Sequence, residues 1–147
     1  MKDDITGRLG GPSDGHDIRC RMDGDTVRGR IGGALMAREL TLDINTDGVN
    51  GKVGGTKGFD VSLRLDGGEL VGQVGREDLR LRGVDRVAGR VGDTIGGVDV
   101  IAVQRGQKIS GRVGGIAGKA FELELGEAPG WVGALVAAVT YYALERH

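Results

Sequence analysis

The chain has 147 residues, a formal net charge of −1 and 39% hydrophobic residues, a composition that fits one folded domain rather than a disordered segment. Its thirty glycines come with only two prolines and no Gly-X-Y period, which excludes collagen, and its balanced charge argues against electrostatic binding of nucleic acid. A single cysteine, Cys20, excludes an internal disulfide and a cysteine-based zinc cluster.

The chain begins without an apolar run of the kind that marks a signal peptide, since residues 1–6 include a lysine and two aspartates. A cytoplasmic, monomeric protein with no cofactor, no bound metal and no transmembrane segment is therefore expected. The repeats and the terminal segment described below form a single domain over residues 1–147.

One six-residue pattern recurs along the chain: apolar, spacer, glycine, mostly basic, apolar, glycine. Successive copies start 22, 22, 21, 17 and 22 residues apart, so a single structural unit repeats. The six copies occupy residues 5–10, 27–32, 49–54, 70–75, 87–92 and 109–114.

Each unit has the pattern of two antiparallel strands. In the first strand the two apolar residues and the glycine between them share one face, as Val27, Gly29 and Ile31 do. The second strand alternates in the same way, and dipeptides such as Asp23-Gly24 mark the turns. Six units over residues 1–126 predict about twelve short strands of five to seven residues.

The fifth unit is the least regular. It follows the fourth after only 17 residues, and the alternation of apolar and polar residues breaks midway through residues 98–103. A bulge or change of register is expected there.

Residues 131–144 are almost entirely apolar and follow Pro129, which is a favourable helix start. A helix that is apolar all round is surrounded by protein or lipid. Fourteen residues span about 21 Å, which is shorter than a bilayer requires. We therefore expect residues 127–147 to form a buried helix.

Together these elements predict an all-β fold with one buried helix: a closed antiparallel barrel of about twelve strands around the hydrophobic C-terminal helix. A twelve-stranded barrel leaves a lumen that a helix about 10 Å across would occupy. The recurring glycine is then expected to remove a side chain where the barrel wall approaches the helix. A parallel β-helix, a propeller and a transmembrane barrel fit the strand lengths and the apolar terminal helix less well.

This arrangement resembles the Tubby C-terminal domain, whose superfamily includes the LURP-one-related proteins and the phospholipid scramblases. The resemblance rests on the hairpin count, on glycine-punctuated strands such as residues 59–72, and on the terminal apolar helix. It implies contact with phosphoinositide-like head groups. Because no motif of a member family is present, the resemblance assigns no lipid-binding residue.

Two short motifs have stronger structural than chemical interpretations. Residues 11–15 match the G-x-S-x-G elbow around Ser13, but they join two hairpin strands, so a hydrolase using Ser13 ranks third among the functions considered. Residues 43–48 match half of an EF-hand loop, yet the position of the bidentate glutamate is Gly54. An Asx-type hairpin turn is favoured there.

Two further residues receive structural interpretations. Cys20 falls on the inward face of its strand, so a buried inert thiol is expected. His16 is interpreted as a solvated turn residue.

The repeated basic position is the main candidate for binding. Its side chains point outward, and on a barrel they form a ring. The favoured interpretation is that these side chains pair with outward acidic residues on neighbouring strands. The alternative is that they contact an anionic ligand. With Arg28, which lies on the same face, the candidate ligand-binding residues are Arg8, Arg28, Arg30, Lys52, Arg90 and Arg112. Further arginines expected to contribute to an anionic contact are Arg19, Arg21, Arg64, Arg80 and Arg82.

The sequence therefore predicts a non-catalytic binding or scaffold domain that contacts anionic lipid head groups or phosphates. The alternative is a purely structural or protein-interaction domain, natural or designed, that binds no small molecule. In the first case the partner is an anionic lipid, and in the second it is another protein.

Overall fold

The computed structural model describes residues 3–11, 15–32, 37–54, 58–92, 97–114 and 118–146. These residues form twelve β-strands, one α-helix and a short π-helix. The strands are β1 (Asp3–Leu9), β2 (His16–Asp23), β3 (Thr26–Ile31), β4 (Arg38–Asn45), β5 (Gly48–Val53), β6 (Phe59–Asp66), β7 (Glu69–Val74), β8 (Glu77–Arg82), β9 (Arg86–Val91), β10 (Val98–Arg105), β11 (Lys108–Val113) and β12 (Lys119–Glu124). They contain six to eight residues each, slightly more than expected.

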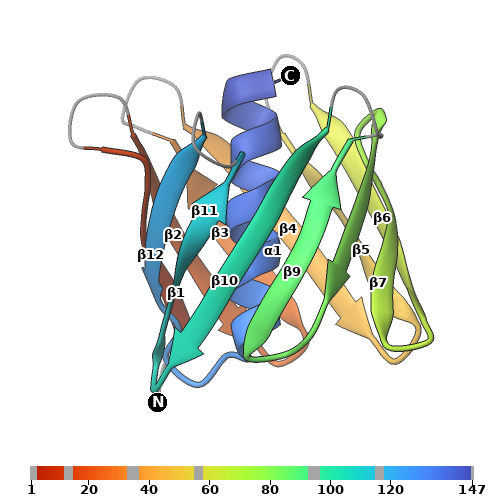
Figure 1. The fold of residues 1–147 in the computed structure, drawn as a ribbon, viewed down its shortest axis with the longest axis horizontal. Coiled ribbons are helices and arrows are strands. Elements are labelled where there is room, and N and C mark those ends of the chain that lie inside the picture. The colour runs from red at the N-terminus through yellow and green to blue at the C-terminus, as the bar shows by residue number, and fades with distance from the viewer. Residues whose placement is uncertain are drawn as a thin grey trace.

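The twelve strands form a closed antiparallel barrel. Each strand pairs with the next along the chain, and β12 pairs with β1 to close the ring (Figure 1). The predicted fold class is therefore confirmed. Closure also removes the exposed strand edges that would otherwise invite association between chains.

The helix α1 (Gly130–Tyr141) runs inside the barrel. It starts at the end with the turns after β2, β4, β6, β8 and β10, which we call the turn end, and runs toward the opposite end (Figure 1). It begins directly after Pro129, and residues 132–140 are all fully buried. The one polar side chain among them, Thr140, donates its hydroxyl to the Val136 carbonyl oxygen at 2.7 Å. The π-helix η2 (Tyr142–Arg146) continues the chain beyond α1. The predicted buried helix is thus confirmed, although its first residue is Gly130 rather than residue 127.

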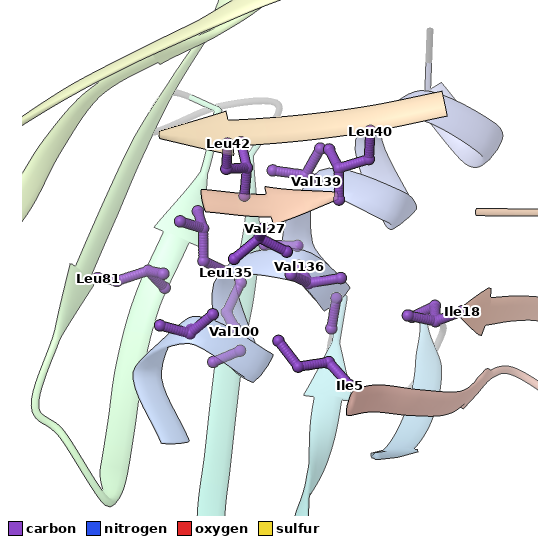
Figure 2. Close-up of a cluster of buried hydrophobic side chains, with 14 of the residues drawn as sticks. Ile5, Ile18, Val27, Leu40, Leu42, Leu81, Val100, Leu135, Val136 and Val139 are labelled. Carbon is purple, nitrogen blue, oxygen red and sulfur yellow. The ribbon is translucent and has the colours of Figure 1, made fainter. Parts of the chain in front are cut away.

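The core consists of the inward side chains of the strands and the side chains of α1. Figure 2 shows Leu135, Val136 and Val139 of the helix among wall residues such as Ile5 and Leu42. All five are fully buried. Because α1 presents an apolar surface in every direction, it is stabilised only while the wall surrounds it.

The mid-strand glycines have a different cause from the one expected. A Cβ added at Gly51 would collide with the Thr41 carbonyl oxygen of β4 and would lie 2.8 Å from the Leu42 Cα. At Gly111 the obstructing groups are likewise backbone atoms of the adjoining strand β10, the nearest being the Ile101 carbonyl oxygen. The glycines therefore permit close approach between neighbouring strands of the curved wall, and the expectation that they make room for the helix is wrong.

The expected irregularity in the fifth unit is also wrong. Strand β10 pairs with β9 and β11 in uninterrupted register, and Val100 and Ala102 point inward in regular alternation. Ile101 and Val103 lie on the outer surface, where their side chains are 57% and 36% exposed. The alternation fails in the sequence because apolar residues stand at outward positions, and the backbone is unaffected.

Candidate functional site

The repeated basic residues lie on the outer surface of the barrel, at equivalent places on the odd-numbered strands. The structure spreads the six predicted binding residues over β1, β3, β5, β9 and β11, and places only Arg28 and Arg30 on one strand. They encircle the barrel rather than forming one patch.

Most of this ring faces acidic side chains. Arg8 forms an ion pair with Asp17, and Arg90 donates to Asp99 at 2.7 Å. Lys52 lies directly opposite Asp60 in the register of β5 and β6. Arg112 instead donates to the Gly118 carbonyl oxygen at 3.3 Å. Such pairs on an exposed surface are worth about 0–1 kcal/mol each, and they leave little local excess of positive charge.

Strands β2 and β3 differ from the rest of the ring. Arg19 lies directly opposite Arg30, and Arg21 lies directly opposite Arg28. All four side chains alternate outward and are exposed. Opposed residues on antiparallel strands have Cβ atoms about 5 Å apart, and alternate residues along a strand are about 7 Å apart. The four side chains therefore leave the backbone at neighbouring positions, about 5 Å apart across the strands and about 7 Å apart along them. We call the surface formed by Arg19, Arg21, Arg28 and Arg30 the arginine face.

Acidic residues flank two of the four arginines: Asp4 lies directly opposite Arg21 on β1, and Glu39 lies directly opposite Arg30 on β4. Within the described part of the chain Arg19 and Arg28 form no ion pair, and Arg30 approaches Glu39 only at 4.0 Å with both side chains more than two-thirds exposed. Like charges directly opposite one another destabilise a strand pair. Arg19 and Arg28 are therefore the residues of the arginine face for which a bound anion would supply a counter-charge.

A second opposed arginine pair provides a contrast. Arg80 and Arg90 face each other across β8 and β9, but Arg80 lies 3.8 Å from Glu69 and Arg90 is held by Asp99. Each arginine of this pair has its own carboxylate, so the pair is close to neutral overall. It is the natural control for any experiment on the arginine face.

The surface over β1, β2 and β3 is hollowed beside the arginine face. A shallow depression there is lined by Arg8, Asp17, Arg19, Arg21 and Arg28, among others. Because Asp17 is occupied by Arg8, the depression combines several cationic side chains with one neutralised acid. Guanidinium groups bind phosphate oxygens through paired N–H donors, so this surface is chemically suited to a phosphate-bearing ligand.

The remaining candidate residues have structural roles or lie outside the part of the chain that the structure describes. Ser13 falls outside the described residues. Cys20 is buried, as expected, and burial raises the pKa of its thiol from 9.0 to about 12. The Asn45 carboxamide oxygen accepts the N–H groups of Asp47 and Gly48 at 2.8 and 2.9 Å, which confirms the Asx turn.

The interpretation of His16 as a solvated turn residue is wrong. His16 begins β2, and its Nε2 lies 2.7 Å from Glu145 Oε2 in η2. Lys119 lies 3.7 Å from the same carboxylate oxygen. These contacts tie the end of the helical segment to the barrel wall, and pairing over 129 residues of sequence separation leaves no local trace in the sequence.

From the sequence, Arg28 and Arg30 were candidate binding residues, whereas Arg19 and Arg21 were only two of five further arginines expected to contribute. A signal for them was present. The two-residue turn at Gly24 and Asp25 sets the register of the hairpin, and that register alone places Arg21 opposite Arg28 and Arg19 opposite Arg30.

Comparisons of the chain with protein-family models, curated proteins and solved structures gave no match. The resemblance to the Tubby C-terminal domain therefore stays a prediction that rests on architecture. None of the helices in the described ranges is long and apolar enough to span a membrane.

Proposed function

We propose that this protein is a non-catalytic binding module whose arginine face contacts phosphate groups, either on anionic lipid head groups or free in solution. The observation that carries the proposal is the direct opposition of Arg19 with Arg30 and of Arg21 with Arg28. Two such pairs side by side raise the local positive potential on a chain whose net charge is −1.

The closed barrel supports a rigid surface of this kind. Hydrogen bonds on both sides fix the spacing of β2 and β3, because β2 also pairs with β1 and β3 also pairs with β4. A preorganised set of donors loses little conformational freedom on binding. The proposed ligand also agrees with what the Tubby resemblance implies, although that resemblance supplied no residues.

The rival function is a structural or protein-interaction domain with no small ligand. The outward apolar residues Ile101 and Val103 on β10 favour this rival, since they provide a nonpolar surface for a protein partner. The two proposals differ in the effect of salt, because an electrostatic contact weakens as ionic strength rises.

Co-sedimentation with vesicles tests the proposal. Wild type is expected to bind vesicles containing anionic phospholipid more tightly than neutral phosphatidylcholine vesicles at low salt, and to lose that preference at high salt. Each basic residue near an anionic surface contributes about 1 kcal/mol, so Arg19→Gln with Arg28→Gln should weaken binding by roughly thirtyfold. Pyrophosphate at low salt separates the two ligand sources: binding of pyrophosphate without binding of anionic vesicles indicates a site for free phosphate, and binding of anionic vesicles that pyrophosphate displaces indicates a lipid surface.

The matched control is the double variant Arg80→Gln with Arg90→Gln. It removes the same number of charges from the other opposed arginine pair, and it should bind as wild type does. Equal losses in both double variants would mean that net charge rather than the arginine face determines binding. If wild type binds neither anionic vesicles nor pyrophosphate at low salt, the structural rival is correct.

A further inference from the structure

The helix does not occupy the barrel symmetrically. It packs most closely against β9, β10 and β11 and against β1 and β2. At the turn end of the barrel, beside the first turn of the helix, a cleft of about 280 Å³ opens on the side of β5, β6, β7 and β8. Its size lies near the lower end of small-molecule binding sites.

The wall of the cleft is apolar. Val49, Leu70 and Leu81 contribute buried side chains, and Trp131 of α1 lines the opposite side. Among the described residues, no charged side chain lines it. The lining side chains with polar atoms are Asn45, whose carboxamide oxygen already accepts the two N–H groups of the Asx turn, and Trp131, whose indole N–H is a donor only. The described lining therefore supplies no charge to pair with a charged ligand.

Two exposed apolar residues converge on the same cleft. Leu65 at the end of β6 and Val84 in the turn after β8 are 56% and 61% exposed, and both line the cleft. Isolated exposed apolar side chains are common, but these belong to different hairpins and meet at one opening. The opening thus extends the buried apolar wall toward solvent.

We propose that this cleft binds an alkyl chain, with the hydrocarbon between Trp131 and the wall and any polar end outside, beyond Leu65 and Val84. The absence of charge in the lining favours a neutral hydrocarbon over an anion, and burial of apolar surface supplies the driving force. This inference goes beyond the phosphate-binding function and does not depend on it. The chain comes either from a free alkyl compound or from a membrane lipid.

Trp131 makes the test direct, because it is the single tryptophan of the chain. Titration with n-hexanol, n-octanol and n-decanol should shift its fluorescence emission to shorter wavelength in a saturable way. Each added methylene should tighten binding by about fourfold until the cleft is full. Bound alkanol should also raise the melting temperature.

Titration with neutral phosphatidylcholine vesicles distinguishes the two sources of the alkyl chain. An emission shift of Trp131 with vesicles as well as alkanols identifies a membrane lipid as the source. An emission shift with alkanols alone identifies a free alkyl compound.

Variants at the opening locate the site. Leu65→Glu with Val84→Glu should weaken n-decanol binding at least tenfold, because charges at the opening must lose water when the chain enters. The matched control, Ile101→Glu with Val103→Glu, removes two exposed apolar residues from β10 and should bind as wild type does. If the first double variant fails to fold, Val84→Ser alone replaces it.

An alkanol response that never saturates, or that is equal in the opening variant and the control, would overturn the proposal. The arginine variant Arg19→Gln with Arg28→Gln should retain alkanol binding. Failure of phosphate binding and failure of alkyl binding are therefore distinguishable.

Discussion

Replacing Gly51 by alanine tests why glycine recurs in the middle of the odd-numbered strands. The added Cβ would lie 2.8 Å from the Leu42 Cα and 2.9 Å from the Thr41 carbonyl carbon, where ordinary contact begins at 3.4 Å. These are backbone atoms of β4, so no side-chain rotation relieves the collision. The two strands must separate, which also strains the hydrogen bonds between them.

The expected cost follows from two opposing effects. Overpacking costs about 1–3 kcal/mol, whereas replacing glycine by alanine stabilises through the unfolded chain by about 0.4–1 kcal/mol. Since the obstructing atoms are backbone, we expect a net loss of about 2 kcal/mol. For a chain of this size that loss lowers the melting temperature by roughly 4–8 °C, measurable by circular dichroism.

Two variants serve as comparisons. Asn50→Ala changes the exposed neighbour on the same strand and should alter stability by no more than about 0.5 kcal/mol. Gly133→Ala places a methyl group on the helix, 2.7 Å from Leu125 Cδ2 and 2.9 Å from Ile109 Cγ2. Because side-chain atoms can shift further than the backbone of a hydrogen-bonded strand and alanine favours a helix, this variant should be less harmful than Gly51→Ala. The reverse order would refute the strand-approach explanation and restore the spacing between helix and wall as the cause.

The enclosed helix, the thiol and the terminal contact give three further predictions. Ala137→Arg buries an unpaired charge and should lower the free energy of unfolding, measured with denaturant, by about 3–5 kcal/mol. Deletion of residues 130–147 should leave a chain that unfolds or aggregates. A deletion variant with an unchanged melting temperature would contradict the enclosed helix. Folding raises the pKa of Cys20 to about 12, so the free energy of unfolding should fall as pH rises from about 9 toward 12. The same thiol should resist alkylation at pH 8 until denaturant is added, and rapid alkylation of the folded chain would show that it is accessible. His16→Ala should speed amide hydrogen exchange in η2 while changing the free energy of global unfolding by less than about 1 kcal/mol. Unchanged exchange in η2 would mean that the contact with Glu145 does not hold this segment against the barrel wall.

Strand number, barrel closure and the enclosed helix were predictable because each follows from a local pattern. Alternation in segments such as residues 27–31 identifies inward faces, and the apolar run after Pro129 identifies a helix that needs a complete surrounding wall. The arginine face was predictable only from hairpin register, since Arg19 and Arg30 become neighbours through the turn between their strands.

Other features depend on distances that no local pattern encodes. The mid-strand glycines respond to the approach of neighbouring backbones, which comes from the curvature of the whole wall. The contact between His16 and Glu145 joins the two ends of the chain. The cleft beside Trp131 exists because the helix lies nearer one side of the barrel, and a helix that is apolar all round does not indicate which side.

The assignment of the arginine face as a phosphate-binding site is tested most directly by one measurement, the melting temperature with and without pyrophosphate at low salt. If opposed arginines repel in the free protein and bind phosphate, Arg19→Gln with Arg28→Gln should melt above wild type without ligand. Pyrophosphate should raise the melting temperature of wild type and leave that of the variant unchanged. A variant that melts below wild type, or that pyrophosphate stabilises as strongly as it stabilises wild type, would contradict the assignment of this face as the binding site.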